Sequence, residues 1–184
     1  MPTTEVKTKY TVKDYMLLEE GAPFQLINYD LVMSPSPSLF HQIISIKVTK
    51  LFLFFLERTN DKGLFLTAPL DIFFDDGNVF QPDLIYISEN RKAEIVKDKI
   101  QGAPDLVVEI LSPSNGYYDL RQKKDIYEKH GIAEYIIIDP IQQSAEVFVL
   151  KDELYILDQK VQESGTFHST ILKGFSVDLK ELFS

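Results

Sequence analysis

The sequence predicts a mixed α/β domain in which a central mixed sheet is flanked by helices. Two apolar runs, Leu106–Leu111 and Tyr135–Ile138, have the length and the β-branched content of buried strands. Between them, Tyr118–His130 has helical spacing and is followed by Gly131, a typical helix C-cap. A strand, a helix and a second strand in this order predict a crossover between strands of one sheet. The length of 184 residues predicts a single domain, residues 1–184, with a substantial core.

The remaining elements follow from hydrophobic periodicity and turn residues. In the first half we expect a short helix capped by Thr11 (Thr11–Glu20), a hairpin turning at residues 28–30 (Phe24–Met33), a loop (Ser34–Ser38), a long helix packed largely in the core (His41–Arg58), strands (Gly63–Thr67, Leu70–Phe74, Phe80–Ile87) and a turn at residues 75–78. In the second half we expect a polar insert (Glu89–Lys99), the crossover, four strands (Glu134–Ile138, Ala145–Leu150, Leu154–Asp158, Thr166–Leu172) and a terminal helical turn (Ser176–Phe183).

Composition narrows the class of protein. The absence of cysteine excludes disulfides and thiolate-bound metal, and it permits a reducing compartment. The longest apolar run, Leu51–Leu56, is too short for a bilayer, and the polar N-terminus does not resemble a signal peptide, so we expect a cytoplasmic protein without membrane contact. The net charge of −9 argues against a general nucleic-acid coat protein. Residues 85–130 hold 8 Lys/Arg and 8 Asp/Glu, so this region is electrically neutral.

Two acids stand within predicted apolar strands. Glu109 lies in the run Leu106–Leu111, and Asp83 lies in Phe80–Ile87. A carboxylate in such a position is costly unless it is paired, hydrogen-bonded or bound to metal. Because strand side chains alternate, each acid stands on a largely apolar face, and the two could converge on one cation if their strands are neighbours. Carboxylates suit magnesium or manganese better than zinc.

The helix at residues 118–130 carries the candidate cations. At roughly 100° per residue, Lys123 lies on the same arc as Ile126 and Tyr127, whereas Lys124 lies on the other flank. Lys123 is therefore expected to point inward, where it could stabilise a pentavalent phosphate; the alternative is a surface lysine that only snorkels.

Other polar residues have simpler readings. His41 is an accessory candidate at a helix start, where capping and packing are the commoner roles, and Lys124 is a second accessory candidate. Glu134 and Asp139 bracket a strand, and we expect a structural ion pair for both. The two acids at positions 75 and 76 fit a turn.

Several of these segments together resemble the Uma two family, described as putative restriction endonucleases, a bacterial branch of the PD-(D/E)XK nuclease superfamily. The resemblance covers nearly the whole chain. Its segments are an opening helix (Tyr10–Glu20), a hairpin ending in SPSP (Phe24–Pro37), the histidine at a helix start (His41), a PD strand (Gln81–Leu84), GAPDLVVEILSPS (Gly102–Ser114), a helix segment (Lys123–Tyr127) and GIAEYIIIDP (Gly131–Pro140).

The resemblance implies a restriction-endonuclease-like fold, commonly dimeric, with Asp83 and Glu109 as metal ligands and Lys123 as the catalytic lysine. In the superfamily the lysine usually stands two residues after the second acid, and here that position is Leu111. A lysine from the following helix would restore the charge. Tyr29 is a second departure, since the family favours glycine at this turn.

The leading hypothesis is a metal-dependent endonuclease that hydrolyses phosphodiesters, using Mg or Mn, with DNA as substrate and a homodimer as the assembly. One alternative is a catalytically silent binding or regulatory module with the same fold, which the charge of −9 favours. Another is a hydrolase of a small phosphate compound.

Overall fold

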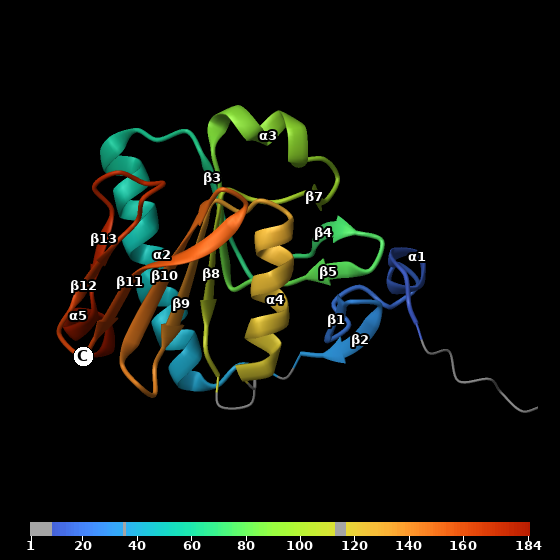
Figure 1. Cartoon of the computed structure of the whole chain (residues 1–184), viewed down its shortest axis with the longest axis horizontal. Helices are drawn as coiled ribbons and strands as arrows, with labels where there is room; N and C mark the ends of the chain where they lie inside the picture. The colour runs from blue at the N-terminus through green and yellow to red at the C-terminus, as the bar shows by residue number, and fades with distance from the viewer. Residues whose placement is uncertain (1–8, 35, 113–116) are drawn as a thin grey trace, which may run out of the picture.

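The computed structural model describes residues 9–34, 36–112 and 117–184, and the side chains of all of these except 117–120. Its centre is a six-stranded sheet in the order β11-β10-β9-β8-β6-β3 (Figure 1). The strands are β3 (Leu64–Thr67), β6 (Leu84–Ile87), β8 (Leu106–Ile110), β9 (Glu134–Asp139), β10 (Ser144–Lys151) and β11 (Leu154–Gln162). The pair β8–β9 is parallel and the other pairs are antiparallel. The predicted mixed sheet is therefore confirmed.

Two helices cover opposite faces of this sheet. The long helix α2 (Leu39–Thr59) packs Ile44, Val48 and Phe52 against one face, in a cluster that includes Val108 of β8. The crossover helix α4 (Tyr117–Lys129) packs on the other face, where Tyr127 joins a cluster with strand residues of opposite parity. The alternation along β8 thus sends Glu109 to the α4 face, because it shares the parity of Val107, a member of that second cluster.

The remaining strands form two further sheets. A second, five-stranded sheet has the order β2-β1-β5-β4-β7, and a third pairs β12 with β13. Their bounds are β1 (Phe24–Ile27), β2 (Asp30–Met33), β4 (Ile72–Asp75), β5 (Asn78–Phe80), β7 (Ile100–Gln101), β12 (Thr166–His168) and β13 (Ser176–Asp178), with helices α1 (Val12–Tyr15), α3 (Glu89–Ile95) and α5 (Leu179–Phe183).

The prediction of one strand at Phe80–Ile87 was wrong. The chain leaves the second sheet after β5 and enters the central sheet at β6, and residues 81–83 lie between the two strands. Pro82 in this connection has no N–H to give to a strand ladder. Asp83 therefore precedes its strand instead of lying inside it, and this frees its carboxylate for the site described below.

Other boundaries also differ. The polar insert contains α3 and β7, and the predicted terminal helical turn begins as strand β13. The first helix ends at Tyr15, and the strand predicted at Thr166–Leu172 ends at His168, whereas β11 extends four residues beyond the prediction. Short segments with few apolar residues give weak periodicity, so their ends could not be placed.

Two local predictions are confirmed by backbone angles. The hairpin turn between β1 and β2 has positive φ at Asn28 (50°) and Tyr29 (69°), the conformation that a two-residue hairpin requires. Gly131 follows α4 with φ 77°, as expected of a C-cap. The second of these fixes where the crossover helix ends.

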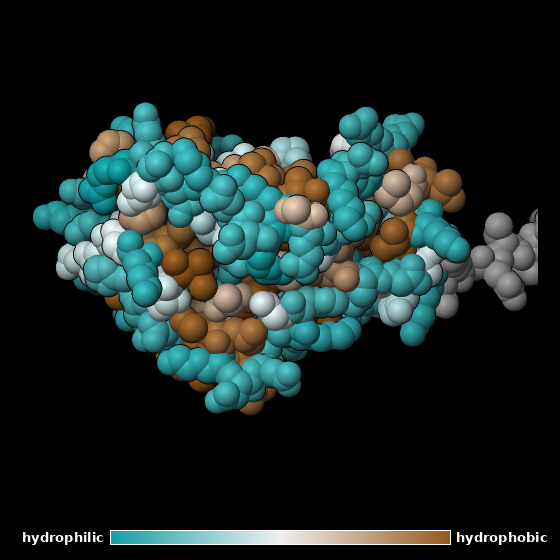
Figure 2. All heavy atoms as spheres, turned by 90° about the horizontal axis from the view of Figure 1, so that it is seen from above, coloured by the Kyte–Doolittle hydropathy of each residue, from teal (hydrophilic) through white to brown (hydrophobic). Residues whose placement is uncertain are grey.

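The long helix α2 has two unlike faces. Six of its residues are buried, but Ile46, Leu53 and Phe54 are 66%, 51% and 62% exposed. Figure 2 shows that hydrophobic side chains reach the surface between hydrophilic ones on the face seen from above. In the described part of the chain α2 alone has the length and apolar composition of a membrane-spanning helix, criteria that a core helix also meets.

Asp75 ties the turn between β4 and β5 to the end of α4. Its carboxylate accepts hydrogen bonds from Gly77 N (2.9 Å) and Asn78 Nδ2 (2.7 Å), and it also contacts Lys129 and His130. Partial burial works against ionisation, but the hydrogen bonds outweigh it and lower the pKa of Asp75 to about 2. The predicted turn at residues 75–78 is confirmed, and its acid also anchors the helix that carries Lys123.

We expect Asp75→Asn to lower the free energy of unfolding by about 1 kcal/mol at pH 7, after allowance for solvent screening. Because the folded-state pKa is below the usual 3.8, this stabilisation is complete above pH 3.8 and disappears as pH falls toward 2. Urea unfolding at successive pH values measures it, with the exposed Asp152→Asn as control. A difference between Asp75→Asn and wild type that persists unchanged into the acid range would contradict the assignment.

Candidate active site

The predicted acids meet at one end of the central sheet. The antiparallel register of β6 and β8 pairs Leu84 with Val108 and Ile85 with Val107. Asp83 directly precedes the first of these pairs, and its carboxylate accepts from the backbone N of Ile110, so it lies beside Glu109 at the end of β8 and next to His41 at the start of α2. Figure 1 shows the start of α2 and the end of β8 at the same end of the sheet. The neighbouring strands required by the sequence argument are present.

Asp83 is held by two groups. Its Oδ2 accepts a hydrogen bond from the backbone N of Ile110 at 2.7 Å, one residue beyond Glu109. Nε2 of His41 lies 3.2 Å from both Oδ1 and Oδ2. His41 occupies the first turn of α2, where Ser38 accepts from its backbone N, so the helix start directs the imidazole at Asp83.

Glu109 is held from α4. Its Oε1 accepts from Nζ of Lys123 at 3.0 Å and from the hydroxyl of Tyr127 at 2.7 Å. Glu109 and Lys123 are 5% and 4% exposed, so this is a buried ion pair. Lys123 and Tyr127 are four residues apart and therefore lie on one helix face.

The surroundings of Glu109 and His41 raise the pKa values of both side chains. Burial raises the pKa of Glu109, and the charge of Asp83 adds to this, against the lowering by Lys123 and Tyr127. Burial of the ring tends to lower the pKa of His41, but the hydrogen bond and charge of Asp83, with Glu109, outweigh it and raise the pKa. Negative charge is thus concentrated here, and each nearby cation stabilises it.

The orientation predicted for the two lysines is confirmed. Lys123 points inward to Glu109, whereas Nζ of Lys124 lies 4.0 Å from the centroid of the Phe148 ring, on the other side of the helix. Lys124 is half-buried and, in the part of the chain that the structure describes, forms no ion pair with either acid. Of the two, Lys123 alone is in reach of the carboxylates.

The carboxylates suit a hard divalent cation. In the part of the chain that the structure describes, Glu109 Oε1 takes both hydrogen bonds and Oε2 takes none. The buried Nδ1 of His41 likewise has no hydrogen-bond partner there. No group of three or more His, Asp or Glu residues in the described ranges is arranged as a metal cage. Magnesium often binds through one or two carboxylates and retains several waters, so Asp83 and Glu109 fit such an ion.

The other acids do not join the site. The expectation that Glu134 and Asp139 would each form a structural ion pair was wrong. Glu134 is fully buried and accepts from Thr170 and Ile171, and Asp139 accepts from the backbone N of Ile141 and Gln142. Both carboxylates fix loops that follow strands. Backbone donors, with the Thr170 hydroxyl, hold Glu134 Oε2 and Asp139 Oδ1, whereas the buried Oε1 of Glu134 has no hydrogen-bond partner in the described residues.

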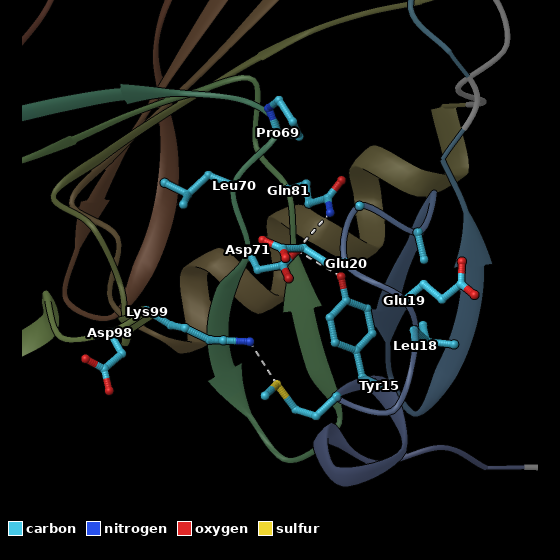
Figure 3. A pocket seen from close by; sticks show the side chains of 13 residues that line it. Tyr15, Leu18, Glu19, Glu20, Pro69, Leu70, Asp71, Gln81, Asp98 and Lys99 are labelled. Atoms are coloured by element: carbon cyan, nitrogen blue, oxygen red, sulfur yellow. Dashed lines mark hydrogen bonds between the residues drawn. The ribbon is translucent and has the colours of Figure 1, made fainter.

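A large acidic cavity lies elsewhere, between α1 and the second sheet (Figure 3). It has a volume of about 620 Å³ and contains none of the predicted site residues. Its central acid, Asp71, accepts from the Tyr15 hydroxyl at 2.9 Å and from Gln81 Nε2 at 2.8 Å. These contacts tie α1 to the sheet, so the polar groups of this cavity have a structural use.

Tyr127 is the contact that the sequence argument missed. It was placed on the inward arc of the helix but not as a partner of Glu109. Burial, followed by the charge of Glu109, raises the pKa of Tyr127 well above its ordinary value, so its hydroxyl remains a donor. The available signal was its spacing of four residues from Lys123, which puts both polar tips on one face.

Comparison with known proteins identifies the family and the fold. The family model Uma2, described as “Putative restriction endonuclease”, matches residues 12–180. Among solved structures, a “putative nuclease belonging to DUF820” from Anabaena variabilis ATCC 29413 superposes with a TM-score of 0.78 at 18% identity. The alignment covers 94% of this chain and 97% of that one, so the two share a fold. The search of curated proteins finds no match. The chain therefore belongs to the Uma2 family of putative restriction endonucleases.

Proposed function

We propose that the protein is a divalent-cation-dependent endonuclease that hydrolyses phosphodiester bonds of DNA. The observation that carries the proposal is that Asp83 is held by the backbone N of Ile110, the residue after Glu109, while Lys123 is buried against Glu109. Asp83 and Glu109 would hold Mg²⁺ or Mn²⁺. Such an ion, when bound, supplies Lewis acidity and lowers the pKa of an attacking water.

The residues around the acids have separate tasks in this proposal. Ile110 N and His41 fix the Asp83 carboxylate, and Tyr127 fixes that of Glu109. Lys123 uses one of its three N–H donors on Glu109 at 3.0 Å, which leaves donors for a phosphate oxygen. Its charge would stabilise the negative charge that develops on phosphorus substituents in the transition state.

The test is the conversion of supercoiled plasmid to nicked or linear DNA by purified protein in the presence of Mg²⁺ or Mn²⁺. Cleavage is expected with either ion and is expected to cease with a chelator. Asp83→Asn is the first variant to compare, because it preserves the hydrogen bond from Ile110 N while it removes a charged ligand. If Asp83→Asn cleaved at the wild-type rate, the assignment of this site would be wrong.

A catalytically silent binding module is the second candidate, favoured by the net charge of −9. Calorimetric titration with Mn²⁺ separates the two. Heat that saturates at one ion per chain and is lost in Asp83→Asn supports the enzyme. The absence of any binding by a folded wild-type protein would favour the silent module.

We also propose that the protein forms a homodimer through the outer face of α2. The exposed residues on this face have alternating spacings of three and four: Ile43, Ile46, Lys50, Leu53 and Glu57. This is the spacing of a helix–helix seam. In an antiparallel pair that crosses near Leu53 and Phe54, Lys50 of each copy would face Glu57 of the other. The face is thus apolar in its centre and self-complementary in charge.

Leu53→Asp is expected to convert the dimer to a monomer, because it places two carboxylates at the crossing point. Light scattering after size exclusion measures the mass. Leu17→Asp is the matched control, since Leu17 is 85% exposed and follows α1, which lies away from α2 (Figure 1). A wild-type monomer at high protein concentration, or loss of the dimer in both variants, would refute this interface.

A further inference from the structure

A cavity of about 340 Å³ adjoins the candidate active site on the α4 side. Its walls are α4, the ends of β8 and β9, and the surfaces of β10 and β11. Leu111, two residues after Glu109, lies at one side, and Phe148 forms part of the wall. Leu111 directly follows β8 and has the same parity as Glu109, so the cavity lies beside the site on the same face of the sheet, although none of the site residues lines it.

The strand register places the cavity in line with the two acids. Glu109 pairs with Ile137 of β9, Ile137 with Glu146 of β10, and Glu146 with Lys160 of β11. Directly paired residues lie on one face of a sheet. With strands about 4.8 Å apart, Glu146 lies about 10 Å from Glu109 across the sheet. This is about three nucleotide rises of 3.4 Å along one DNA strand.

The charges in the cavity favour an anion. Its acids are already engaged: Glu146 Oε1 accepts from Lys160 at 2.8 Å, and Asp139 Oδ1 accepts from two backbone N–H groups of the following turn. Arg121 and Lys124, one helical turn apart on α4, have no acidic partner in the described part of the chain. The lining thus combines Arg121, Lys124 and Lys160 with the carboxylates of Asp139 and Glu146, an excess of one positive charge.

Lys124 is also positioned. Its ammonium lies 4.0 Å from the centroid of the Phe148 ring, and the side chain is half-buried. An aromatic ring attracts a cation without satisfying its N–H donors. The ring thus keeps the ammonium in the cavity and leaves the donors for a ligand. Arg121 is exposed at the mouth, where a guanidinium can bind phosphate oxygens bidentately.

We propose that Arg121 and Lys124 bind a backbone phosphate of the nucleic-acid strand a few nucleotides from the bond that the acids cleave. The proposal rests on the proposed function for the identity of the ligand. It gives a protein of charge −9 a local means of holding a polyanion beside its catalytic carboxylates. Lys123 and Lys124, adjacent in sequence, then serve two different phosphates.

The test is the salt dependence of binding to a fluorescein-labelled DNA duplex, followed by anisotropy without divalent metal so that cleavage does not interfere. The double variant Arg121→Gln/Lys124→Gln is compared with Lys151→Gln/Lys173→Gln. The control removes the same charge from exposed lysines, one of them at the opposite end of β10. Thermal melting establishes that both variants fold.

We expect the slope of log K against log salt to decrease by about 1 for each cation, about 2 in the test variant, and to stay near wild type in the control. Equal decreases in both variants, no decrease in either, or no DNA binding by wild type would overturn the proposal. Binding that depends on Arg121 and Lys124 without any metal-dependent cleavage would support this phosphate site while the proposed function fails. Metal-dependent cleavage by wild type, with no change of salt slope in the Arg121→Gln/Lys124→Gln variant, would support the proposed function while this phosphate site fails.

Discussion

Replacing Glu109 by glutamine is expected to lower the rate of plasmid nicking by at least about 10²-fold, the scale seen when one electrostatic contribution to a transition state is removed. Glutamine has nearly the same shape, but it offers a divalent cation a neutral amide in place of a carboxylate. The loss should therefore accompany a loss of Mn²⁺ binding in calorimetry. Nicking that survives at the wild-type rate in Glu109→Gln would refute the catalytic assignment.

The same variant is expected to fold. Glu109→Gln leaves Lys123 as a buried cation without its counter-charge, but Lys123 and Tyr127 can still donate to the amide oxygen, so the loss should stay below the about 3–5 kcal/mol that breaking a buried ion pair costs. Glu134→Gln is the matched control, because Glu134 is also fully buried on a neighbouring strand but lies away from the candidate site, at the start of β9. We expect this control to lose stability through Thr170 and to retain nicking.

The sequence could predict the central sheet because its strands are continuous apolar runs. The segments Leu106–Leu111 and Tyr135–Ile138 correspond within a residue or two to β8 and β9, and both are buried on two faces. The prediction of one strand at residues 80–87 was wrong for a physical reason. The chain stays hydrophobic where it passes from one sheet to the other, and hydrophobic periodicity indicates which residues are buried but not which strands they pair with. Helix α3 was not predicted within the polar insert because it buries only Ile95 and therefore has little hydrophobic periodicity.

The parts of the site that follow from the free-energy cost of burying a charge could be predicted from the sequence. A glutamate among buried valines needed a cation, and helix phase selected Lys123, which the structure places at 3.0 Å. The parts that depend on tertiary approach could not be predicted. His41 is 42 residues from Asp83, and only the packing of α2 on the sheet brings the imidazole to 3.2 Å. The backbone N of Ile110 is a donor whose direction is set by the strand ladder.

The ion pair between Lys123 and Glu109 leads to the prediction with the largest effect on stability. In Lys123→Met, Glu109 is left buried with Asp83 nearby and without its adjacent cation. Removing one partner of a buried ion pair costs about 3–5 kcal/mol, so the free energy of unfolding without metal should fall by that amount. Lys124→Met is the control, and the loss of its contact with Phe148 should cost about 1 kcal/mol or less.

Divalent metal should restore much of what Lys123→Met loses, because the cation replaces the missing charge between the carboxylates. An ion at about 100 times its Kd adds about 2.7 kcal/mol to the stability of any protein that binds it only when folded. In Lys123→Met the rise should exceed that of wild type, since Glu109 no longer shares Oε1 with an ammonium. Thermal melting in a Mn²⁺ series measures both rises.

Nicking should stay low in Lys123→Met even with metal, whereas Lys124→Met should bind DNA more weakly and keep its turnover rate. Equal metal responses in wild type and Lys123→Met would mean that the ion does not occupy the space between Asp83 and Glu109.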